Sequence, residues 1–344
     1  MISTRAIKQV DIDIVEKYID WDKLACPIVY KRSNRGRPPK LTNVQILKIV
    51  YLQEKEHILH DTDMAKFLNT NCRYKEFLDY HKSEEIAHDL ISKIKRKISK
   101  KTWLSVQQLL DKELEKLNYF KNDNLSFDGT DLRTHVKSKI GNWGAKSDNK
   151  KFHGLWLMAL NSTNHEIVRQ FEIDDAKIGQ IILAKKVLRK AKTIDLSNIE
   201  EICGDGIFDT KEIRDIIKDN LRKRAVIPYN CKNSKIRDSK DLPDDDWRLE
   251  STEFLRDKEE FKKHYKKRTG SERENSRLKE WTLVGRTEEK TTRCPKIKRK
   301  SIINQAILSI IFTQTTALGE WLHQLEYPIT VQTNLESYVE LATC

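Results

Sequence analysis

The sequence lacks the paired cysteines and histidines that mark zinc sites and disulfide frameworks. Its six cysteines contain no Cys-x2-Cys pair, and none of its nine histidines forms a His-Glu-x2-His motif. These absences argue against a zinc ribbon and against a small disulfide-stabilised scaffold. The cysteines are Cys26, Cys72, Cys203, Cys231, Cys294 and Cys344. A reducing cytoplasm is the simplest compartment for cysteines scattered in this way.

The sequence also shows no signal peptide and no uninterrupted apolar run long enough to span a membrane. Residues 1–20 are amphipathic and charged without an apolar centre, so they do not read as a secretion signal. The most apolar stretch, residues 302–322, is interrupted by Asn304, Gln305, Ser309 and Gln314. We therefore expect a buried helix there, and not a membrane span.

What the sequence has in excess is positive charge. Lys and Arg number 65 against 52 Asp and Glu, which gives a net charge of +13 and a pI near 9.2. Residues 261–300 alone hold 15 Lys or Arg and 5 Asp or Glu. A basic balance with a local concentration of this kind favours a polyanionic partner such as a nucleic acid.

The most basic part of the chain contains four residues spaced Tyr265-x2-Arg268-x3-Glu272-x6-Lys279. At about 100° per residue on an α-helix, these offsets place all four side chains within a stripe of roughly 60°. Such a face would carry a carboxylate for a metal ion between two cations for phosphates. The alternative is an ordinary solvated, charge-rich helix.

Two upstream aspartates favour the chemical interpretation. Asp128 stands at the end of an alternating strand pattern and is followed by Gly129, and Asp205 follows a short strand in the same way. Asp131 is an alternative to Asp128. Asp209, which lies three residues before a Glu, is better explained as the N-cap of a helix.

The signature, with aspartates in Asp-Gly-Thr and Gly-Asp-Gly contexts upstream, resembles the Asp-Asp-Glu transposases of bacterial and archaeal insertion sequences, in the group marked by Tyr-Arg-Glu-Lys. The resemblance covers most of the chain. It implies that Asp128, Asp205 and Glu272 are catalytic carboxylates that bind metal, with Glu274 as the alternative to Glu272.

The same resemblance implies the remaining parts of the site. Tyr265, Arg268 and Lys279 would contact transposon-end DNA or order the site, and the cofactor would be Mg2+ or Mn2+, as two ions. An all-oxygen ligand set suits these ions and not zinc. The expected partners are transposon-end and target DNA and a second subunit at paired ends, in the cytoplasm of a prokaryote. The chain departs from many relatives because only 67 residues separate Asp205 from Glu272, so the usual β-rich insertion would be reduced.

The predicted fold class is α/β: a ribonuclease H-like mixed-sheet core preceded by an all-helical N-terminal DNA-binding region. The expected division is residues 1–120 for the helical region, 121–325 for the core with a short insertion at about 230–260, and 326–344 for a tail. The core pattern predicts three strands in series, then helix, strand, helix and strand. The strands are expected at 123–128, 154–160, 165–172, 200–204 and 224–228, and the helices at 176–192 and 210–220.

Arg35-Gly36-Arg37-Pro38 precedes the first well-patterned helix, which Thr42 is placed to cap. Two arginines flanking a glycine can enter a narrow A·T-rich minor groove. A basic linker leading into a helix explains the same residues equally well.

The resemblance predicts a transposase that cleaves insertion-sequence ends and transfers strands into target DNA. A non-catalytic DNA-binding descendant and a host nuclease on the same fold are the alternatives. The presence of all three acids with their basic partners argues against simple loss of activity.

Overall fold

The computed structural model describes residues 10–28, 41–81, 84–145, 150–233, 236–294 and 296–326. Its N-terminal part is helical, as the sequence predicts. The helices are α1 (Ile12–Tyr18), α2 (Trp21–Ala25), α3 (Asn43–Lys55), α4 (Asp61–Thr70), α5 (Cys72–Phe77), α6 (His88–Lys97) and α7 (Lys100–Lys116). Thr42 caps α3 in a capping box with Gln45, which confirms the predicted start of that helix. The segment with Arg35 and Arg37 lies outside the described residues.

A mixed sheet follows the helices and carries the candidate site. Its strands are β1 (Leu125–Arg133), β2 (Asn142–Ala145), β3 (Lys151–Ser162), β4 (Val168–Asp175), β5 (Glu201–Gly204) and β6 (Arg224–Val226). The spatial order is β2-β3-β1-β5-β6, and β4 pairs with β3. β1 runs antiparallel to β3 and parallel to β5, and β5 runs parallel to β6. This order confirms a ribonuclease H-like core.

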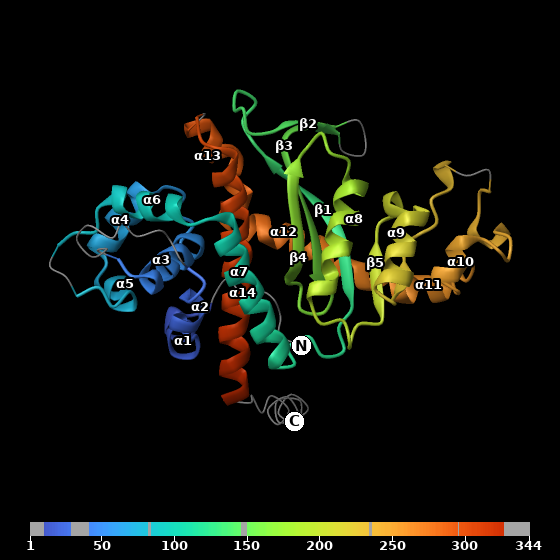
Figure 1. The fold of residues 1–344 in the computed structure, drawn as a ribbon, viewed down its shortest axis with the longest axis horizontal. Coiled ribbons are helices and arrows are strands. Elements are labelled where there is room, and N and C mark those ends of the chain that lie inside the picture. Colours follow the sequence, from blue (N-terminus) through green and yellow to red (C-terminus); the bar gives the residue numbers. More distant parts are fainter. Residues whose placement is uncertain are drawn as a thin grey trace, which may run out of the picture.

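Two hydrophobic cores lie on opposite faces of this sheet. On one face, α8 (Gln180–Lys190) and α9 (Lys211–Asp215) cover the apolar side chains of β1, β3, β5 and β6. The other face shares its core with the N-terminal helices and with α14 (Arg299–Glu326). Figure 1 shows α14 standing between the helical region and the sheet. The N-terminal helices are thereby packed into the same body as the core.

The long helix α14 has the length and composition of a membrane span, but 89% of its most apolar window is buried inside the protein. Its Gln314 amide donates to the carbonyl of Val168 in β4, and its Thr316 hydroxyl pairs with Tyr51 of α3. Three of the polar residues that interrupt its apolar run, Gln305, Ser309 and Gln314, therefore bond to neighbouring elements. The prediction of a buried helix at 302–322 is confirmed.

The insertion expected at about residues 230–260 is short and has little regular structure. It contains α10 (Trp247–Ser251) and leads into α11 (Lys258–Tyr265). The fully buried Asp209 carboxylate binds Arg214 of α9 at 2.9 Å and Arg248 of α10 at 3.2 Å. Arg248 in turn lies 4.1 Å from the Trp247 ring centroid. These ion pairs fix the insertion against the core.

Two expectations about this part of the chain need correction. Asp209 is not a helix N-cap, because Thr210 caps α9 while Asp209 forms the buried ion pairs. The short strand β2 was not expected, because its four residues are mostly exposed and polar or small and give no alternating pattern. The domain boundaries predicted from the sequence stay predictions.

Candidate active site

The parallel pairing of β1 and β5 brings Asp128 and Asp205 to one edge of the sheet. Phe127 is in register with Gly204, so the residue that follows each of them is an aspartate. The prediction that a strand ends at Asp128 is wrong, because β1 continues to Arg133 and pairs with β3 along its whole length. A side chain at Gly204 would begin 2.4 Å from the ring of Phe127. Glycine at 204 therefore lets β5 pack closely against the Phe127 ring of β1.

Asp205 also has a local role that the sequence did not reveal. Its carboxylate accepts a hydrogen bond of 2.6 Å from the N–H of Gly206 and caps the short 3₁₀ turn Gly206–Phe208. Its side chain remains 41% exposed. The cap orients the carboxylate while leaving most of its lone pairs available.

The third acid comes from α12 (Thr269–Trp281), whose first turn is packed tightly against the sheet. A side chain at Gly270 would begin 2.5 Å from the carbonyl oxygen of Thr163. Ser271 donates to the carbonyl of Ser126 at 3.0 Å and accepts from the amide of Asn161 at 3.1 Å. Because Ser126 and Asp128 point to the same face of β1, these contacts set α12 in register with the first aspartate.

Arg268 lies at the centre of the three acids. Its guanidinium is 2.8 Å from Glu272 and 3.7 Å from Asp205, and it also interacts electrostatically with Asp128. Burial opposes the charge of Arg268, but the three surrounding acids hold its pKa above the ordinary value for arginine. The guanidinium is therefore the counter-ion of the carboxylate cluster.

Tyr265 supports this arginine from one side. The Arg268 guanidinium lies 5.7 Å from the Tyr265 ring centroid, within the range of a cation–π contact. Burial raises the pKa of Tyr265 to about 12, so its phenol is protonated at neutral pH. Tyr265 orients Arg268 without adding charge to the site.

The environment of Asp128 combines opposing influences. Burial raises the pKa of its carboxyl, and the negative charge of Asp205 acts in the same direction. Arg268, the N–H of Gly129 and the amide of Asn275 favour the ionised form. The net effect is a pKa above the ordinary value, which an additional cation would reverse.

The two acids left open as alternatives, Asp131 and Glu274, lie in surroundings that do not suit a metal ligand. Asp131 is buried and binds Lys279 and Arg133, each at 2.7 Å. Glu274 faces the interior of the protein, and burial raises its pKa to about 8. The ion pairs of Asp131 and the burial of Glu274 favour Asp128 and Glu272 as the acids of the site.

The signature residues share one helical region, but not one uninterrupted α-helix. Tyr265 ends α11, Arg268 belongs to the 3₁₀ segment Lys266–Arg268, and Glu272 and Lys279 lie in α12. The 3₁₀ turn is tighter than an α-turn, so the simple 60° stripe is wrong in detail. It nevertheless leaves Tyr265, Arg268 and Glu272 in contact with one another, while Lys279 reaches Asp131.

The 3₁₀ segment is held in place by Glu201, a residue that sequence reasoning missed. Its carboxylate is fully buried in β5 and binds Lys267 at 2.8 Å, His264 at 2.5 Å and Arg224 at 3.0 Å. Glu201 thus connects β5, whose end carries Asp205, to the helix that carries Arg268. No pattern in the sequence marked it, because a lone acid before a strand has many possible roles.

The donor set fits a hard divalent cation. It consists of carboxylate oxygens from three elements around one positive charge, which is the ligand chemistry of Mg2+ and Mn2+. As the side chains lie, no three His, Cys, Asp or Glu residues in the described part of the chain are close enough together to hold an ion. Arg268 occupies the space between the acids, so the carboxylates would have to close up as the guanidinium moves aside.

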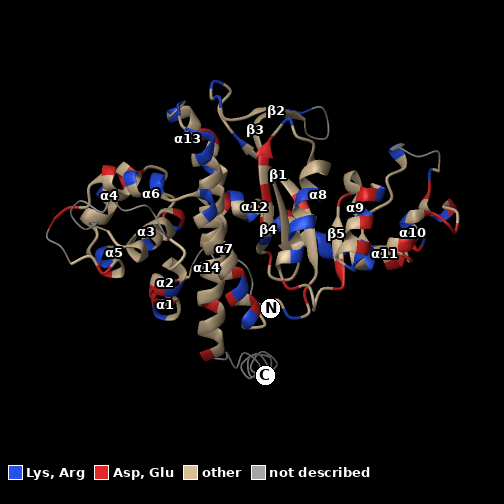
Figure 2. Cartoon of the chain, in the orientation of Figure 1, with Lys and Arg blue, Asp and Glu red and all other residues tan. Residues whose placement is uncertain are grey.

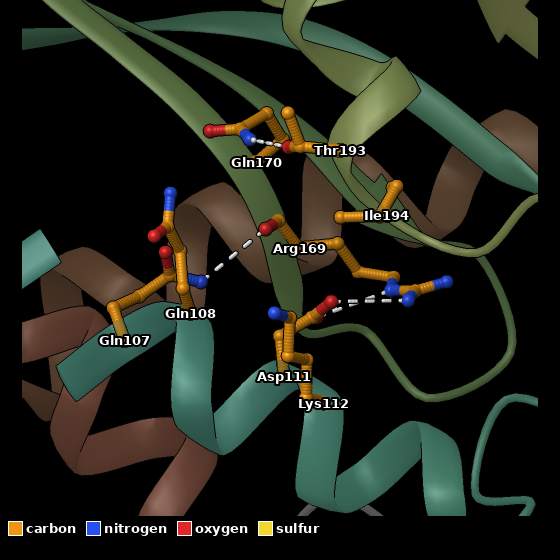
Figure 3. A pocket seen from close by; sticks show the side chains of 8 residues that line it. All are labelled: Gln107, Gln108, Asp111, Lys112, Arg169, Gln170, Thr193 and Ile194. Atoms are coloured by element: carbon orange, nitrogen blue, oxygen red, sulfur yellow. Dashed lines mark hydrogen bonds and ion pairs between the residues drawn. The ribbon is translucent and has the colours of Figure 1, made fainter. Parts of the chain in front are cut away.

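Other charged features lie away from this site. Lys and Arg are spread over the helical region, the core and α13 (Thr287–Arg293) (Figure 2). A polar cavity of about 160 Å³ lies between α7 and β4, where Arg169 and Asp111 pair at 3.1 Å (Figure 3). This ion pair joins the helical region to the sheet. None of the three acids lines the cavity.

Comparisons with known proteins agree with the geometry. Residues 120–293 match the family described as transposase DDE domain, and residues 4–97 match the family described as transposase domain. No curated protein matches the chain. Among solved structures, the chain is similar to a piggyBac transposase synaptic complex with hairpin DNA, at 10% identity and a TM-score of 0.37. That alignment covers 98% of this chain and 86% of the other, but a likeness this distant adds nothing to the assignment.

Proposed function

The chain belongs to the family of transposases with a DDE domain, and from this premise we propose that it cuts insertion-sequence ends and joins them to target DNA. One observation carries the proposal. Asp128, Asp205 and Glu272, from three separate elements, converge on the single cation Arg268. Members of this family generally use divalent metal ions, and we propose Mg2+ or Mn2+, as two ions, for this chain.

In the proposed mechanism the three carboxylates hold the ions. When bound, the ions would activate a water or a DNA 3′-hydroxyl and stabilise the leaving oxygen of the scissile phosphate. Asp205 is oriented for this by its bond to the N–H of Gly206, and Asp128 by its place in β1 and its hydrogen bond from Asn275. No covalent bond between protein and DNA is needed.

Arg268 acquires a second role once the acids bind metal. Released from Glu272, its guanidinium can donate paired hydrogen bonds to oxygens of the DNA phosphate, the geometry for which arginine is suited. Tyr265 limits how far the guanidinium moves, because it stacks beside it. Arg268 would thereby exchange its carboxylate partners for a DNA phosphate.

DNA binding is proposed to rest on the basic surface as a whole. The net charge of +13 supplies affinity through phosphate contacts, to which Lys279 and the Arg35 and Arg37 arm would contribute. We assign the chain to the Tyr-Arg-Glu-Lys group because all four signature residues are present in one helical region. A homodimer at paired ends and a prokaryotic cytoplasm complete the proposal.

Replacing the acids one at a time tests the proposal. Asp128→Asn, Asp205→Asn and Glu272→Gln should each abolish cleavage and joining of linear end DNA in Mg2+ while leaving end binding largely intact. Glu280→Gln is the matched control, because Glu280 is exposed on the same helix. Cleavage that persists in all three variants would overturn the assignment.

The same assay separates the alternatives. A host nuclease would cleave but would not join the ends to a supercoiled target. A non-catalytic descendant would bind ends without cutting them in either Mg2+ or Mn2+.

A further inference from the structure

Asn275 lies on the same side of α12 as Glu272, three residues further along the helix. Residues three apart on a helix are neighbours on its surface. Its side chain is only 7% exposed, and its Nδ2 donates a hydrogen bond to Oδ2 of Asp128 at 3.2 Å. An amide from the helix of the third acid therefore touches the first acid directly.

The other end of this amide has no partner. Oδ1 of Asn275 is buried and accepts no hydrogen bond from the protein. A buried acceptor left unsatisfied costs about 1–3 kcal/mol, and such atoms in native proteins usually have a water, an ion or a functional role. Oδ1 is bonded to the same carbon as Nδ2, so the unpaired acceptor lies within one amide group of the atom that contacts Asp128.

Three carboxylates repel one another, so a further ligand is better tolerated if it carries no charge. The carbonyl oxygen of an asparagine is such a ligand, and it is common in sites for hard cations. Hydrogen bonds to ligating carboxylates also fix their orientation, and their loss typically weakens metal binding by about 10–100-fold. Asn275 offers both features from one side chain.

We propose that Asn275 is a positioning residue of the metal site: Nδ2 orients Asp128, and Oδ1 supplies an additional, neutral oxygen to the ion that Asp128 binds. The inference rests on the proposed function, because it requires Asp128 to be a metal ligand. A purely structural role, in which the amide only ties α12 to β1, predicts different behaviour toward metal.

The test is Mn2+ binding to the full-length protein without DNA, measured by electron paramagnetic resonance, together with the thermal midpoint with and without Mn2+. Asn275→Ala should weaken Mn2+ binding by about 10-fold or more. Asn275→Asp keeps an oxygen but places a carboxylate beside Asp128. It should therefore lower the midpoint without metal and show a larger Mn2+-induced rise than the unaltered protein. Ser276→Ala, at the exposed neighbouring position, is the control and should change neither quantity.

The outcomes separate this inference from the proposed function. If Asp128→Asn weakens Mn2+ binding but Asn275→Ala does not, the role of Asn275 is structural and the inference fails while the site stands. If Asp128→Asn binds Mn2+ as the unaltered protein does, the metal site itself is misplaced. Should Asn275→Ala fail to fold, the Mn2+ response of Asn275→Asp decides: a rise no larger than in the unaltered protein overturns the inference.

Discussion

Nη1 of Arg268 lies 2.8 Å from Oε1 of Glu272, one helical turn further along the chain. Salt bridges at this spacing are ordinary on exposed helices and contribute little to stability. This one differs because Asp205 and Asp128 surround the same guanidinium. An arginine thus holds together the acids that the proposed mechanism assigns to metal ions.

The first prediction follows because the Arg268 guanidinium and a metal ion would compete for the same three carboxylates. Arg268→Ala should bind Mn2+ at least as tightly as the unaltered protein, because the guanidinium no longer competes for the acids. Cleavage of end DNA should nevertheless fall by about 100-fold, since a charge that stabilises the transferring phosphate is lost. Equilibrium Mn2+ binding and single-turnover cleavage measure the two effects.

Lys266→Ala is the control for Arg268→Ala. Lys266 is an exposed cation of the same 3₁₀ segment, and its loss should leave both measurements nearly unchanged. Weaker Mn2+ binding in Arg268→Ala would show that the arginine supports the acids and does not compete for them.

The second prediction concerns Glu274, the buried acid two residues beyond Glu272. Its pKa of about 8 in the folded protein lies above its ordinary value of 4.5, and burial is the cause. The folded state therefore binds this proton more tightly than the unfolded state does. The contribution of Glu274 to stability is fully present below about pH 4.5. It is lost as the pH rises toward 8, by up to about 1.4 kcal/mol per pH unit.

Glu274→Gln should remove this part of the pH dependence. Urea unfolding at pH 5, 6.5 and 8 should show the variant gaining stability over the unaltered protein as the pH rises. Glu280→Gln, on the exposed part of the same helix, should follow the unaltered protein. Parallel curves for Glu274→Gln and the unaltered protein would mean that this acid does not titrate between pH 5 and 8.

The sequence points to candidate site residues more readily than to the contacts that support them. Asp128 and Asp205 became candidates because each was expected to end a strand before a glycine. The parallel pairing of β1 and β5 does bring them together, but only Asp205 follows the end of a strand, since β1 continues to Arg133. Asn275 and Glu201 were missed, because their roles depend on contacts across 147 and 66 residues of sequence, respectively. Such contacts arise from tertiary packing and leave no local pattern.

The geometry of the signature was also only partly predictable. A spacing rule assumes a uniform α-helix, whereas residues Lys266–Arg268 form a 3₁₀ turn. The Glu201 carboxylate binds Lys267 and His264 around that turn. A buried charge on a neighbouring strand thus sets the local winding, and the sequence of the helix alone does not contain that information.

The third prediction concerns the arm formed by Arg35 and Arg37. Replacing both with Ala should weaken binding to A·T-rich ends more than binding to G·C-rich DNA of equal length, because a narrow minor groove attracts guanidinium groups. Fluorescence anisotropy at fixed salt measures both affinities. Equal losses on the two DNAs would reduce the arm to a phosphate contact.

The last prediction concerns Lys279, which could contact DNA as well as form its ion pair with Asp131. Its ammonium group binds the buried Asp131 carboxylate at 2.7 Å, yet the side chain remains 34% exposed. If it also contacts a phosphate, Lys279→Gln should flatten the log–log dependence of DNA affinity on salt by about one unit, because one contact releases about one counterion. Glutamine is preferred to alanine because its amide can still donate to Asp131.

Lys263→Gln is the matched control, since Lys263 is 72% exposed and binds Glu260 on α11. Its slope should stay close to that of the unaltered protein. Equal flattening in both variants would mean that the basic helix acts as a diffuse field, and an unchanged slope in Lys279→Gln would leave this lysine with only its structural bond to Asp131.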